Sequence, residues 1–375
     1  MTDLGLALTD PDSRPPGLIN RLAASRPFQR WAARFPLTRR LVRREGEAMF
    51  DLVAGFCHSQ ILQALVAFGI PALLLDRSLT TAGLARRAQV PPARMEVLLR
   101  GGAAIGLLSA RRDGTWTLTP RGAALATVPG LADMIRHHAI LYRDLADPVA
   151  FFRGETDTGL AAFWPYVFGA GAAQDPATAD RYSRLMADSQ TLVAEDTLAA
   201  LDLRSARHLM DVGGGTGAFL AAVARAAPHL RLTLFDLPAV APQARARFAA
   251  DRIDVAIIPG SFRDDPLPQG ADAISLVRVL YDHADDTVRA LLARAHAALP
   301  PGGRLIISEP MTGGTRPERA GDAYFALYCM AMRTGRARSA AEIAALLAAS
   351  GFAAITTPRP ARPFVTSIIT AVRPD

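Results

Sequence analysis

The sequence contains few cysteines and no lysine. Its 375 residues include two cysteines, Cys57 and Cys329, which lie far apart and fit neither a disulfide framework nor a multi-cysteine metal site. All 42 basic residues are arginine, so compositional bias contributes to the formal net charge of +7. Basic charge alone therefore does not indicate a nucleic-acid-binding protein.

The sequence also lacks the apolar segments that membrane insertion or secretion requires. It has no uninterrupted run of about 18 apolar residues, the length that a transmembrane helix needs. Its N-terminus carries acidic residues and prolines where a secretory signal has a basic start and an apolar core. We therefore expect a cytoplasmic protein, with 50% hydrophobic residues and enough length for two domains.

Arginines alternate with apolar residues near the N-terminus, between Arg21 and Arg44. Trp31 and Phe35 lie in this segment among closely spaced arginines. A basic amphipathic segment of this kind can touch anionic lipid or a partner protein. The alternative is a solvated helix that packs on its own domain.

Three segments precede the C-terminal half. Residues 1–45 form an extension with prolines and arginines. Residues 46–128 begin with the apolar stretch Phe50–Leu74, which we interpret as one or two buried helices. A winged-helix pattern follows, with Thr80 or Thr81 capping one helix, Pro91 and Pro92 opening the next, and a hairpin that turns at Arg112–Gly114. Residues 129–200 are helical and form a connector that contributes to the substrate pocket.

The sequence pattern changes in residues 201–375, where short β-rich runs alternate with alanine-rich helical runs. Alternation of this kind predicts an α/β domain with a mostly parallel sheet flanked by helices. The expected strands are Leu209–Val212, Leu232–Phe235, Val255–Ile258, Ala273–Val279, Leu305–Ser308 and Ile368–Val372.

The most specific motif is a glycine-rich loop, Asp211–Gly217, between the first of these strands and a helix. Glycines let the backbone turn tightly and approach a ligand closely. Asp236 ends the next strand, where a carboxylate can accept hydrogen bonds from a ribose diol. The spacing fits a dinucleotide or S-adenosylmethionine. Asp211 before the glycines, the presence of only one such loop, and Pro301–Gly303 before a later strand favour S-adenosyl-L-methionine.

With these motifs, residues 45–375 resemble the class I small-molecule O-methyltransferases that carry an N-terminal winged-helix dimerisation domain. The resemblance implies a homodimer and a cofactor site in which the loop wraps the methionine part and Asp236 holds the ribose. Serine replaces the family's usual aspartate in the motif beside the adenine. The residues that the resemblance places at the cofactor are Asp211, Gly213, Gly215, Asp236, Leu237, Ser261, Phe262 and Met186.

The resemblance also locates the catalytic residues, with one departure from the family pattern. Family members place a histidine base in a Leu-His-Asp-Trp sequence, whereas this chain has Tyr281 at the histidine position and His283 at the tryptophan position. A phenol with a pKa near 10 is a poor base at neutral pH. Our hypothesis is that Tyr281 lines the reacting centre and His283 accepts the proton, which requires an irregular loop. Glu309 matches an acid that supports the base.

Three stretches resemble, more narrowly, the enzymes that methylate the tertiary hydroxyl of acyclic carotenoids on the route to spheroidene in purple photosynthetic bacteria. They are Phe50–Phe56, Val277–His283 and Gly321–Ala326. This resemblance implies a small hydrophobic substrate and peripheral contact with the photosynthetic membrane. A bacteriochlorophyll precursor or an aromatic polyketide is the alternative acceptor. The histidines make no metal spacing with acids or cysteines, so we expect no metal.

A DNA-binding regulator is the alternative from a different class, because a winged helix and a basic composition are typical of such proteins. The helix after Pro91 offers only Arg94 and Arg100 as cations and is otherwise apolar, which indicates a buried helix. We therefore expect no nucleic-acid partner. A protein that keeps the cofactor pocket but has lost methyl transfer is a third interpretation, favoured by Ser261 and Tyr281.

Overall fold

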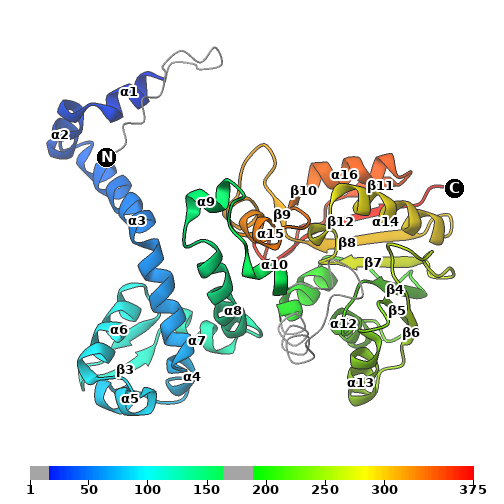
Figure 1. The fold of residues 1–375 in the computed structure, drawn as a ribbon, viewed down its shortest axis with the longest axis horizontal. Coiled ribbons are helices and arrows are strands. Elements are labelled where there is room, and N and C mark those ends of the chain that lie inside the picture. Colours follow the sequence, from blue (N-terminus) through cyan, green and yellow to red (C-terminus); the bar gives the residue numbers. More distant parts are fainter. Residues whose placement is uncertain (1–16, 164–188) are drawn as a thin grey trace. The chain divides into compact units, whose positions relative to one another are not determined.

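The computed structural model describes residues 17–163 and 189–375, so Met186 lies outside the described residues. The chain divides into two compact units (Figure 1). One unit contains the chain up to Phe68 together with Ser78–Trp116, and the other contains Gly69–Arg77 together with Thr117–Asp375.

The first unit contains the winged-helix pattern that the sequence predicts. The Thr80 side chain caps α5 by accepting a hydrogen bond from the Gly83 N–H at 3.1 Å, and Gly114 has a φ of +77° in the hairpin turn. The three short strands form a sheet in the order β1-β3-β2. Its elements are α1 (Leu18–Ala24), α2 (Arg26–Arg34), α3 (Arg39–Ala67), β1 (Leu79–Thr80), α5 (Thr81–Ala88), α6 (Pro92–Ala104), β2 (Leu108–Ala110) and β3 (Thr115–Leu118).

Helix α3 corrects the expectation that the apolar stretch Phe50–Leu74 is buried. Two helices form there, α3 and α4 (Ile70–Leu73), and Leu65 and Val66 are buried. Earlier in α3, however, five apolar side chains are 61–75% exposed, because no other element within residues 17–163 and 189–375 covers them: Met49, Phe50, Leu52, Val53 and Phe56. By length and composition α3 is the one helix among the described residues that could cross a membrane.

Helices α7 (Pro120–Thr127), α8 (Leu131–Asp144), α9 (Pro148–Phe152) and α10 (Gly159–Phe163) begin the larger part of the second unit, and a further helix covers residues 189–199. A seven-stranded sheet then follows in the order β11-β12-β8-β7-β4-β5-β6. β4 (His208–Val212), β5 (Arg231–Asp236), β6 (Ala256–Pro259), β7 (Ala273–Val277) and β8 (Arg304–Glu309) are parallel, and β12 (Ser367–Val372) is antiparallel to β8.

The predicted α/β class and its six strands are confirmed, with two differences. Strand β7 ends at Val277 rather than at Val279, because Arg278 adopts a φ of +58° and leaves the extended conformation. The sheet also gains β11 (Ala353–Thr356) at its edge, antiparallel to β12.

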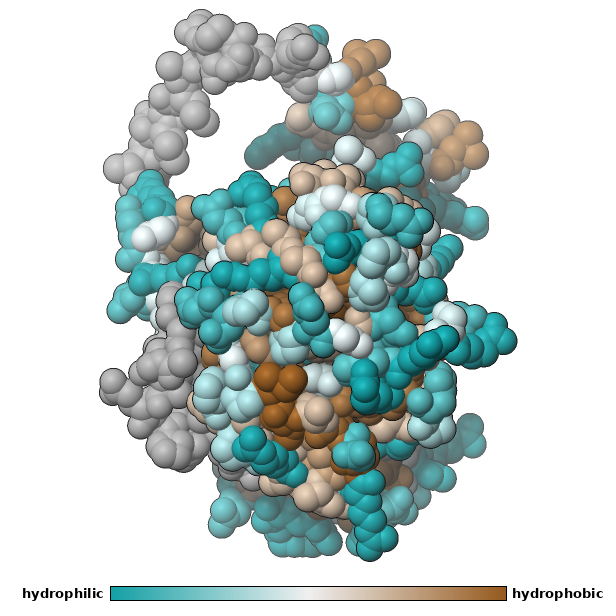
Figure 2. Space-filling model, turned by 90° about the vertical axis from the view of Figure 1, so that its right-hand side faces the viewer, coloured by the Kyte–Doolittle hydropathy of each residue, from teal (hydrophilic) through white to brown (hydrophobic). Residues whose placement is uncertain are grey.

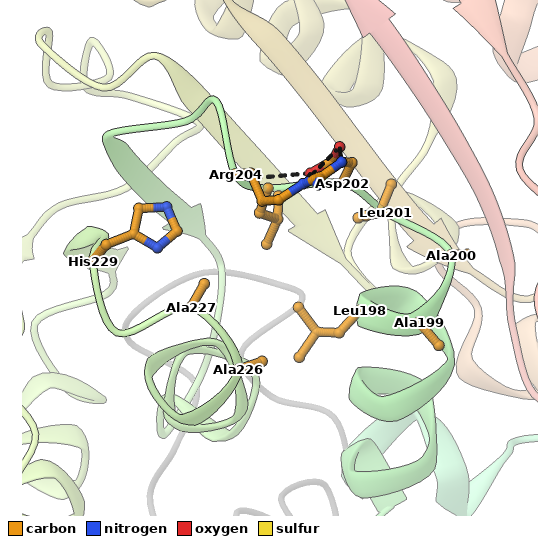
Figure 3. A pocket seen from close by; sticks show the side chains of 10 residues that line it. Leu198, Ala199, Ala200, Leu201, Asp202, Arg204, Ala226, Ala227 and His229 are labelled. Carbon is orange, nitrogen blue, oxygen red and sulfur yellow. Dashed lines mark hydrogen bonds and ion pairs between the residues drawn. The ribbon is translucent and has the colours of Figure 1, made fainter.

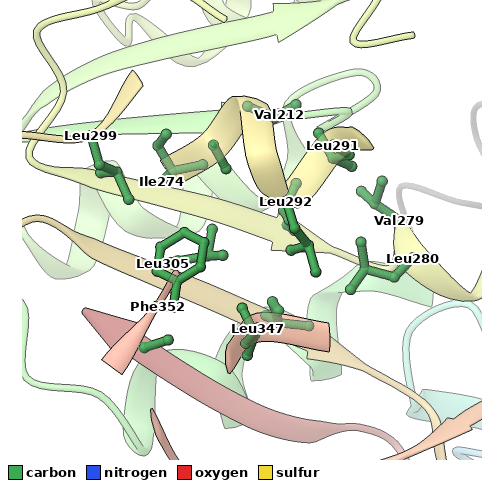
Figure 4. Close-up of a cluster of buried hydrophobic side chains, with 14 of the residues drawn as sticks. Val212, Ile274, Val279, Leu280, Leu291, Leu292, Leu299, Leu305, Leu347 and Phe352 are labelled. Carbon is green, nitrogen blue, oxygen red and sulfur yellow. The ribbon is translucent and has the colours of Figure 1, made fainter. Parts of the chain in front are cut away.

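Alternating side chains of the central strands fill two apolar cores, one on each face of the sheet. Met210 and Val212 of β4 belong to the core with α14 (Asp285–Ala298) and α16 (Ala340–Ala349), part of which Figure 4 shows. Leu209 belongs to the other core, with α12 (Ala218–Ala226) and α13 (Ala241–Asp251). Both faces are therefore covered, which leaves the carboxyl ends of the strands for a site.

A buried arginine fixes the turn that follows β7. Arg338, on β10 (Arg338–Ser339), has no exposed surface. Its guanidinium donates to the carbonyl oxygens of Leu280 at 2.9 Å and His283 at 2.8 Å, and to the Asp285 carboxylate at 2.6 Å. The backbone from Leu280 to Asp285 is therefore held by one side chain.

We expect Arg338→Met to lower the free energy of unfolding by about 2–6 kcal/mol, since it leaves the buried carbonyl oxygens of Leu280 and His283 without this donor, at about 1–3 kcal/mol each. Urea denaturation followed by circular dichroism measures this loss. Arg336→Met is the matched control, because Arg336 also pairs with Asp285, at 3.2 Å, but is 47% exposed. Its expected loss is at most about 1 kcal/mol. Equal losses in the two variants would contradict the role assigned to burial.

Candidate functional site at the carboxyl ends of the strands

The glycine-rich loop leaves β4 with three residues in the left-handed region. Gly213, Gly215 and Gly217 have φ values of +71°, +61° and +78°, which side chains rarely allow. A Cβ atom at Gly213 would lie 3.1 Å from the Val279 side chain, whereas one at Gly215 would meet no atom within 4 Å. The loop therefore has an open side at Gly215, where a ligand can contact bare backbone.

Asp236 lies at the same edge, at the end of β5, and is partly exposed. Its carboxylate accepts hydrogen bonds from the Gly215 N–H at 2.6 Å and the Leu237 N–H at 2.7 Å. Burial raises the pKa of Asp236, while these two backbone donors lower it. Asp236 thus links the glycine loop to the second strand, and its remaining lone pairs can accept from a ligand.

Asp211 lies beneath the loop and is fully buried. The Ser275 hydroxyl donates to its Oδ1 at 2.6 Å, while its Oδ2 has no hydrogen-bond partner among the described residues. A Cβ atom at Gly214 would collide with this carboxyl group. Burial raises the pKa of Asp211 to about 7, the Ser275 hydrogen bond lowers it, and nearby Asp236 raises it further. Asp211 therefore supports the loop from the protein side.

Ser261 and Phe262 follow β6. The Ser261 hydroxyl donates to Asp264 at 2.9 Å, and its N–H donates to Asp265 at 2.8 Å, so two nearby acids surround the serine that replaces the family aspartate. The Phe262 ring lies near Gly213, since a Cβ there would be 3.6 Å from it. These residues form the side of the site next to the glycine loop.

Tyr281 and His283 lie in an irregular turn, as the hypothesis required, but face different partners. Tyr281 lies in the 3-10 helix η2 (Leu280–Asp282), and His283 directly follows it. Both side chains are buried, at 2% and 8% exposure. Burial raises the pKa of the Tyr281 hydroxyl well above its usual value, against the opposing effect of Arg278. The His283 ring packs against Phe262 with centroids 5.2 Å apart.

The Nδ1 atom of His283 accepts a hydrogen bond from Arg263 at 2.9 Å. Burial, with the positive charges of Arg263 and Arg338, lowers its pKa to about 3. His283 is therefore a neutral ring on the Phe262 side of the site. The Tyr281 hydroxyl has a different partner, since it accepts a hydrogen bond from Arg278 at 3.3 Å.

Glu309 ends β8 and is fully buried. Its Oε2 accepts from the Leu280 N–H at 2.9 Å and from the Tyr281 N–H at 3.3 Å. Burial raises its pKa to about 8, opposed by the charge of Arg338 and these backbone donors. Glu309 therefore holds the backbone of the turn that carries Tyr281.

Arg278 is a site residue that the sequence reasoning missed, although it lies in the stretch Val277–His283 singled out there. Its guanidinium donates to the Ser189 hydroxyl at 2.8 Å and to the Tyr281 hydroxyl. Asp282, in the same turn, has a pKa raised to about 7 by burial and lowered by Arg278. A cation and a carboxyl group thus lie beside Tyr281.

Two histidine–tyrosine pairs were also missed. The Nε2 of His137 lies 2.7 Å from the Tyr328 hydroxyl, and that of His138 lies 2.6 Å from the Tyr324 hydroxyl. The histidines are on α8, and the tyrosines are on the π-helix η3 (Arg319–Phe325) and on α15 (Ala326–Met332). The partners are 186 and 191 residues apart, so no local motif could reveal them.

A hollow of about 550 Å³ lies elsewhere in this unit. Figure 3 shows the side chains that line it. It is lined by Leu198–Arg204, which precede β4, and by Ala226, Ala227 and His229, which precede β5. It therefore lies at the amino ends of the strands, whereas ligands of open α/β sheets bind at the carboxyl ends. Within residues 17–163 and 189–375, no group of three or more His, Cys, Asp or Glu side chains has an arrangement that could hold a metal ion.

The raised pKa of Asp211 predicts a pH-dependent stability. The folded chain retains a proton that the unfolded chain releases above its ordinary pKa near 4, so stability falls as the pH rises toward about 7. Asp211→Asn cannot release this proton. Its free energy of unfolding relative to the wild type should therefore rise from pH 5 to pH 7, by at most about 1.4 kcal/mol per pH unit.

Urea denaturation at both pH values checks this expectation. Asp113→Asn is the control, because the pKa of this exposed carboxylate is lowered by its hydrogen bonds to Thr115, and its effect lies below pH 4. A stability difference for Asp211→Asn that does not change with pH would contradict the assignment.

Comparison with known proteins agrees with this arrangement. The family model of the O-methyltransferase domain matches residues 142–353, and that of the O-methyltransferase dimerisation domain matches residues 50–128. The demethylspheroidene O-methyltransferase of Cereibacter sphaeroides is 58% identical over 95% of this chain and 94% of its own length. That of Rhodobacter capsulatus is 56% identical over 96% of this chain and 91% of its own.

A solved structure described as PigF with SAH is 25% identical, with a TM-score of 0.67 over 87% of this chain and 99% of its own. The matched families and the extent of these similarities decide between the enzyme and the DNA-binding regulator. The chain is an enzyme that belongs to the O-methyltransferase family and carries that family's dimerisation domain.

Proposed function

We propose that this O-methyltransferase binds S-adenosyl-L-methionine at the glycine loop and methylates the tertiary hydroxyl of an acyclic carotenoid of the demethylspheroidene type. The observation that carries the proposal is the 56–58% identity to two demethylspheroidene O-methyltransferases over nearly the whole chain. Family members with other acceptors, such as a mouse acetylserotonin O-methyltransferase, are 32% identical.

The residues at the carboxyl edge fit this cofactor. The open backbone at Gly215 can approach the methionine part, Asp236 can accept from the ribose hydroxyls, and Phe262 offers a flat apolar ring for the adenine. When bound, the cofactor supplies an electrophilic methyl carbon on a sulfonium. No step in this chemistry needs a metal, and we propose that the enzyme uses none.

Apolar side chains next to the turn fit a polyene acceptor. α8, α9, α10 and α15 contribute to one cluster, and Tyr281 lies near it, since its ring centroid is 6.4 Å from that of Phe325, the residue before α15. A polyene has no polar group except its hydroxyl, so it needs such a surface. The members with exposed surface, which an acceptor can contact, are Ile140, Leu145, Tyr324 and Leu327. They pack against the buried Leu141, Phe151, Leu160, Tyr328, Ala331 and Met332.

The sequence-predicted catalytic residues take different roles in this proposal. Tyr281 keeps its proton, because burial raises its pKa, and its hydroxyl helps to hold Arg278 in place. Glu309 positions Tyr281 through the turn backbone. His283 supports Phe262 on the cofactor side and does not accept the proton, since its Nδ1 already accepts from Arg263.

Product analysis with labelled cofactor tests the proposal. The purified enzyme should methylate an acyclic hydroxycarotenoid and should not methylate a bacteriochlorophyll precursor or an aromatic polyketide. Asp236→Asn should weaken cofactor binding about tenfold or more, because one charge-assisted acceptor, worth about 1.5–3 kcal/mol, is lost. Calorimetric titration measures it, and Asp251→Asn, at an exposed residue at the end of α13, is the control. Methylation of a flat aromatic compound but not of the carotenoid would refute the proposed identity of the acceptor.

We further propose that the enzyme is a homodimer in the cytoplasm whose N-terminal segment contacts the membrane that holds the carotenoid. Phe28, Trp31 and Phe35 form a row of rings with centroids 5.6 and 4.8 Å apart, and helical spacing places Arg26, Arg30 and Arg34 on another side of α2. Figure 2 shows apolar and polar side chains next to one another around α1 and α2, at the top of the view.

Charge favours anionic lipid as the partner of this segment. No Asp or Glu occurs between Gly17 and Arg44, where eight arginines lie, so two copies of the segment would repel each other. Aromatic rings with surrounding arginines are typical of helices that lie in a membrane interface.

We therefore expect the enzyme to cosediment with vesicles of phosphatidylcholine and phosphatidylglycerol and much less with phosphatidylcholine alone. Arg30→Gln/Arg34→Gln should weaken this binding about 30-fold, at about 1 kcal/mol per arginine. Arg111→Gln/Arg112→Gln, on the hairpin, is the matched control and should bind as the wild type does. Equal binding to both vesicle types, or a changed oligomeric state in place of changed lipid binding, would contradict the proposal.

A further inference from the structure

We infer that the His138–Tyr324 pair accepts the proton of the acceptor hydroxyl during methyl transfer. The inference rests on the proposed O-methyl transfer and assigns the base that the sequence leaves open. The Tyr324 hydroxyl, 2.6 Å from the His138 Nε2, would contact the acceptor hydroxyl and donate to the imidazole.

A series of contacts leads from the glycine loop to this pair. The Val279 side chain lies against Gly213, and the preceding residue, Arg278, donates to the Tyr281 hydroxyl. The Tyr281 ring lies 6.4 Å from the Phe325 ring, which lies 4.8 Å from the Tyr324 ring.

The charge of Arg278 also acts on both hydroxyls, since it lowers the pKa of Tyr281 and of Tyr324 against the larger raising effect of burial. Tyr324 is therefore separated by one aromatic ring, that of Phe325, from Tyr281, the position at which the family resemblance places a histidine base.

The other titratable groups of the turn are already engaged. The Tyr281 hydroxyl is buried, has a raised pKa and accepts from Arg278. Glu309 binds the turn backbone, and His283 accepts from Arg263. Asp282 is the remaining rival, since its Oδ1 is buried without a hydrogen-bond partner among the described residues. The test below includes it.

The two histidine–tyrosine pairs differ in accessibility, which separates a catalytic pair from a structural one. His137 and Tyr328 are buried, at 9% and 6% exposure, whereas His138 and Tyr324 are both partly exposed. Only the second pair has surface that an acceptor can contact. The first pair has the same chemistry on the same elements and is therefore a matched control.

One methyl group and one proton move in this reaction. The acceptor oxygen forms a bond to the methyl carbon, whose bond to sulfur breaks with the electron pair remaining on sulfur. The acceptor proton passes to the Tyr324 oxygen as the Tyr324 proton passes to the His138 Nε2. The resulting imidazolium loses its proton to solvent after the ether has left, and Tyr324 ends unchanged.

Burial lowers the pKa of His138 and keeps its ring neutral, so that its Nε2 can accept a proton. The groups that face the pair are His137 on α8, Tyr142 on the same helix, Tyr328 on α15 and Arg278 after β7. None of them is a carboxylate that would stabilise the imidazolium. Turnover should therefore stay constant near neutral pH and fall only on acidification.

The experiment measures kcat for the carotenoid between pH 5 and pH 9 at saturating cofactor. A positioned base contributes about 10²–10⁴-fold, so His138→Gln and Tyr324→Phe should each lower kcat at least about 100-fold. KM should change little, because the acceptor is held mainly by apolar surface. Added imidazole should restore part of the activity of His138→Ala. His137→Gln and Tyr328→Phe should lower kcat less than about fivefold and show no rescue by imidazole.

Two results would overturn the inference. One is an unchanged kcat and pH profile in His138→Gln, with Asp282→Asn inactive instead. The other is an equal loss in all four pair variants without rescue by imidazole, which would indicate a structural role. Calorimetric titration with the cofactor shows whether each variant is folded. Failure of the wild-type enzyme to methylate the carotenoid would instead refute the proposed function, so the two failures are distinguishable.

Discussion

The position of the turn from Leu280 to Asp285 depends on two buried side chains, one that donates hydrogen bonds to its backbone and one that accepts them. Arg338 donates to the carbonyl oxygens of Leu280 and His283, and Glu309 accepts from the Leu280 N–H. Buried backbone groups without partners are costly, so these side chains decide which conformation the turn adopts. As a consequence, two side chains only two residues apart have separate partners: Tyr281 contacts Arg278, and His283 contacts Arg263 and Phe262.

The site therefore has two sources. The parallel sheet brings the glycine loop and Asp236 to one edge, because the carboxyl ends of neighbouring parallel strands meet there. The helices α8 and α15, with η3 between β9 (Met311–Thr312) and α15, supply apolar surface and two hydrogen-bonded histidine–tyrosine pairs. The sheet is suited to a polar nucleoside and the helices to an apolar acceptor, and the turn after β7 lies where the two meet.

The strands and the glycine loop could be predicted because their signals are local: buried strands are apolar runs, and positive φ angles need glycine. Strand β11 could not, because Ala353–Thr356 is largely exposed and has no alternation. The exposure of Phe50 and its neighbours could not be predicted from apolar composition, which does not say what covers a helix. The histidine–tyrosine pairs join residues more than 180 positions apart, and Arg278 acquires its role only through a left-handed backbone at the end of β7.

The π-helix η3 places the Tyr324 side chain where a regular α-helix would not place it. It covers Arg319–Phe325 and continues directly into α15, so Tyr324 and Tyr328 are separated by a change of helical type. A π-helical turn holds an additional residue compared with an α-helical one, and such turns occur often at functional sites. Shortening this segment by one residue would return it to α-helical winding and rotate its side chains by about 100°. Tyr324 would then turn away from His138 while α15 stayed in place. This segment should therefore tolerate substitutions better than insertions or deletions.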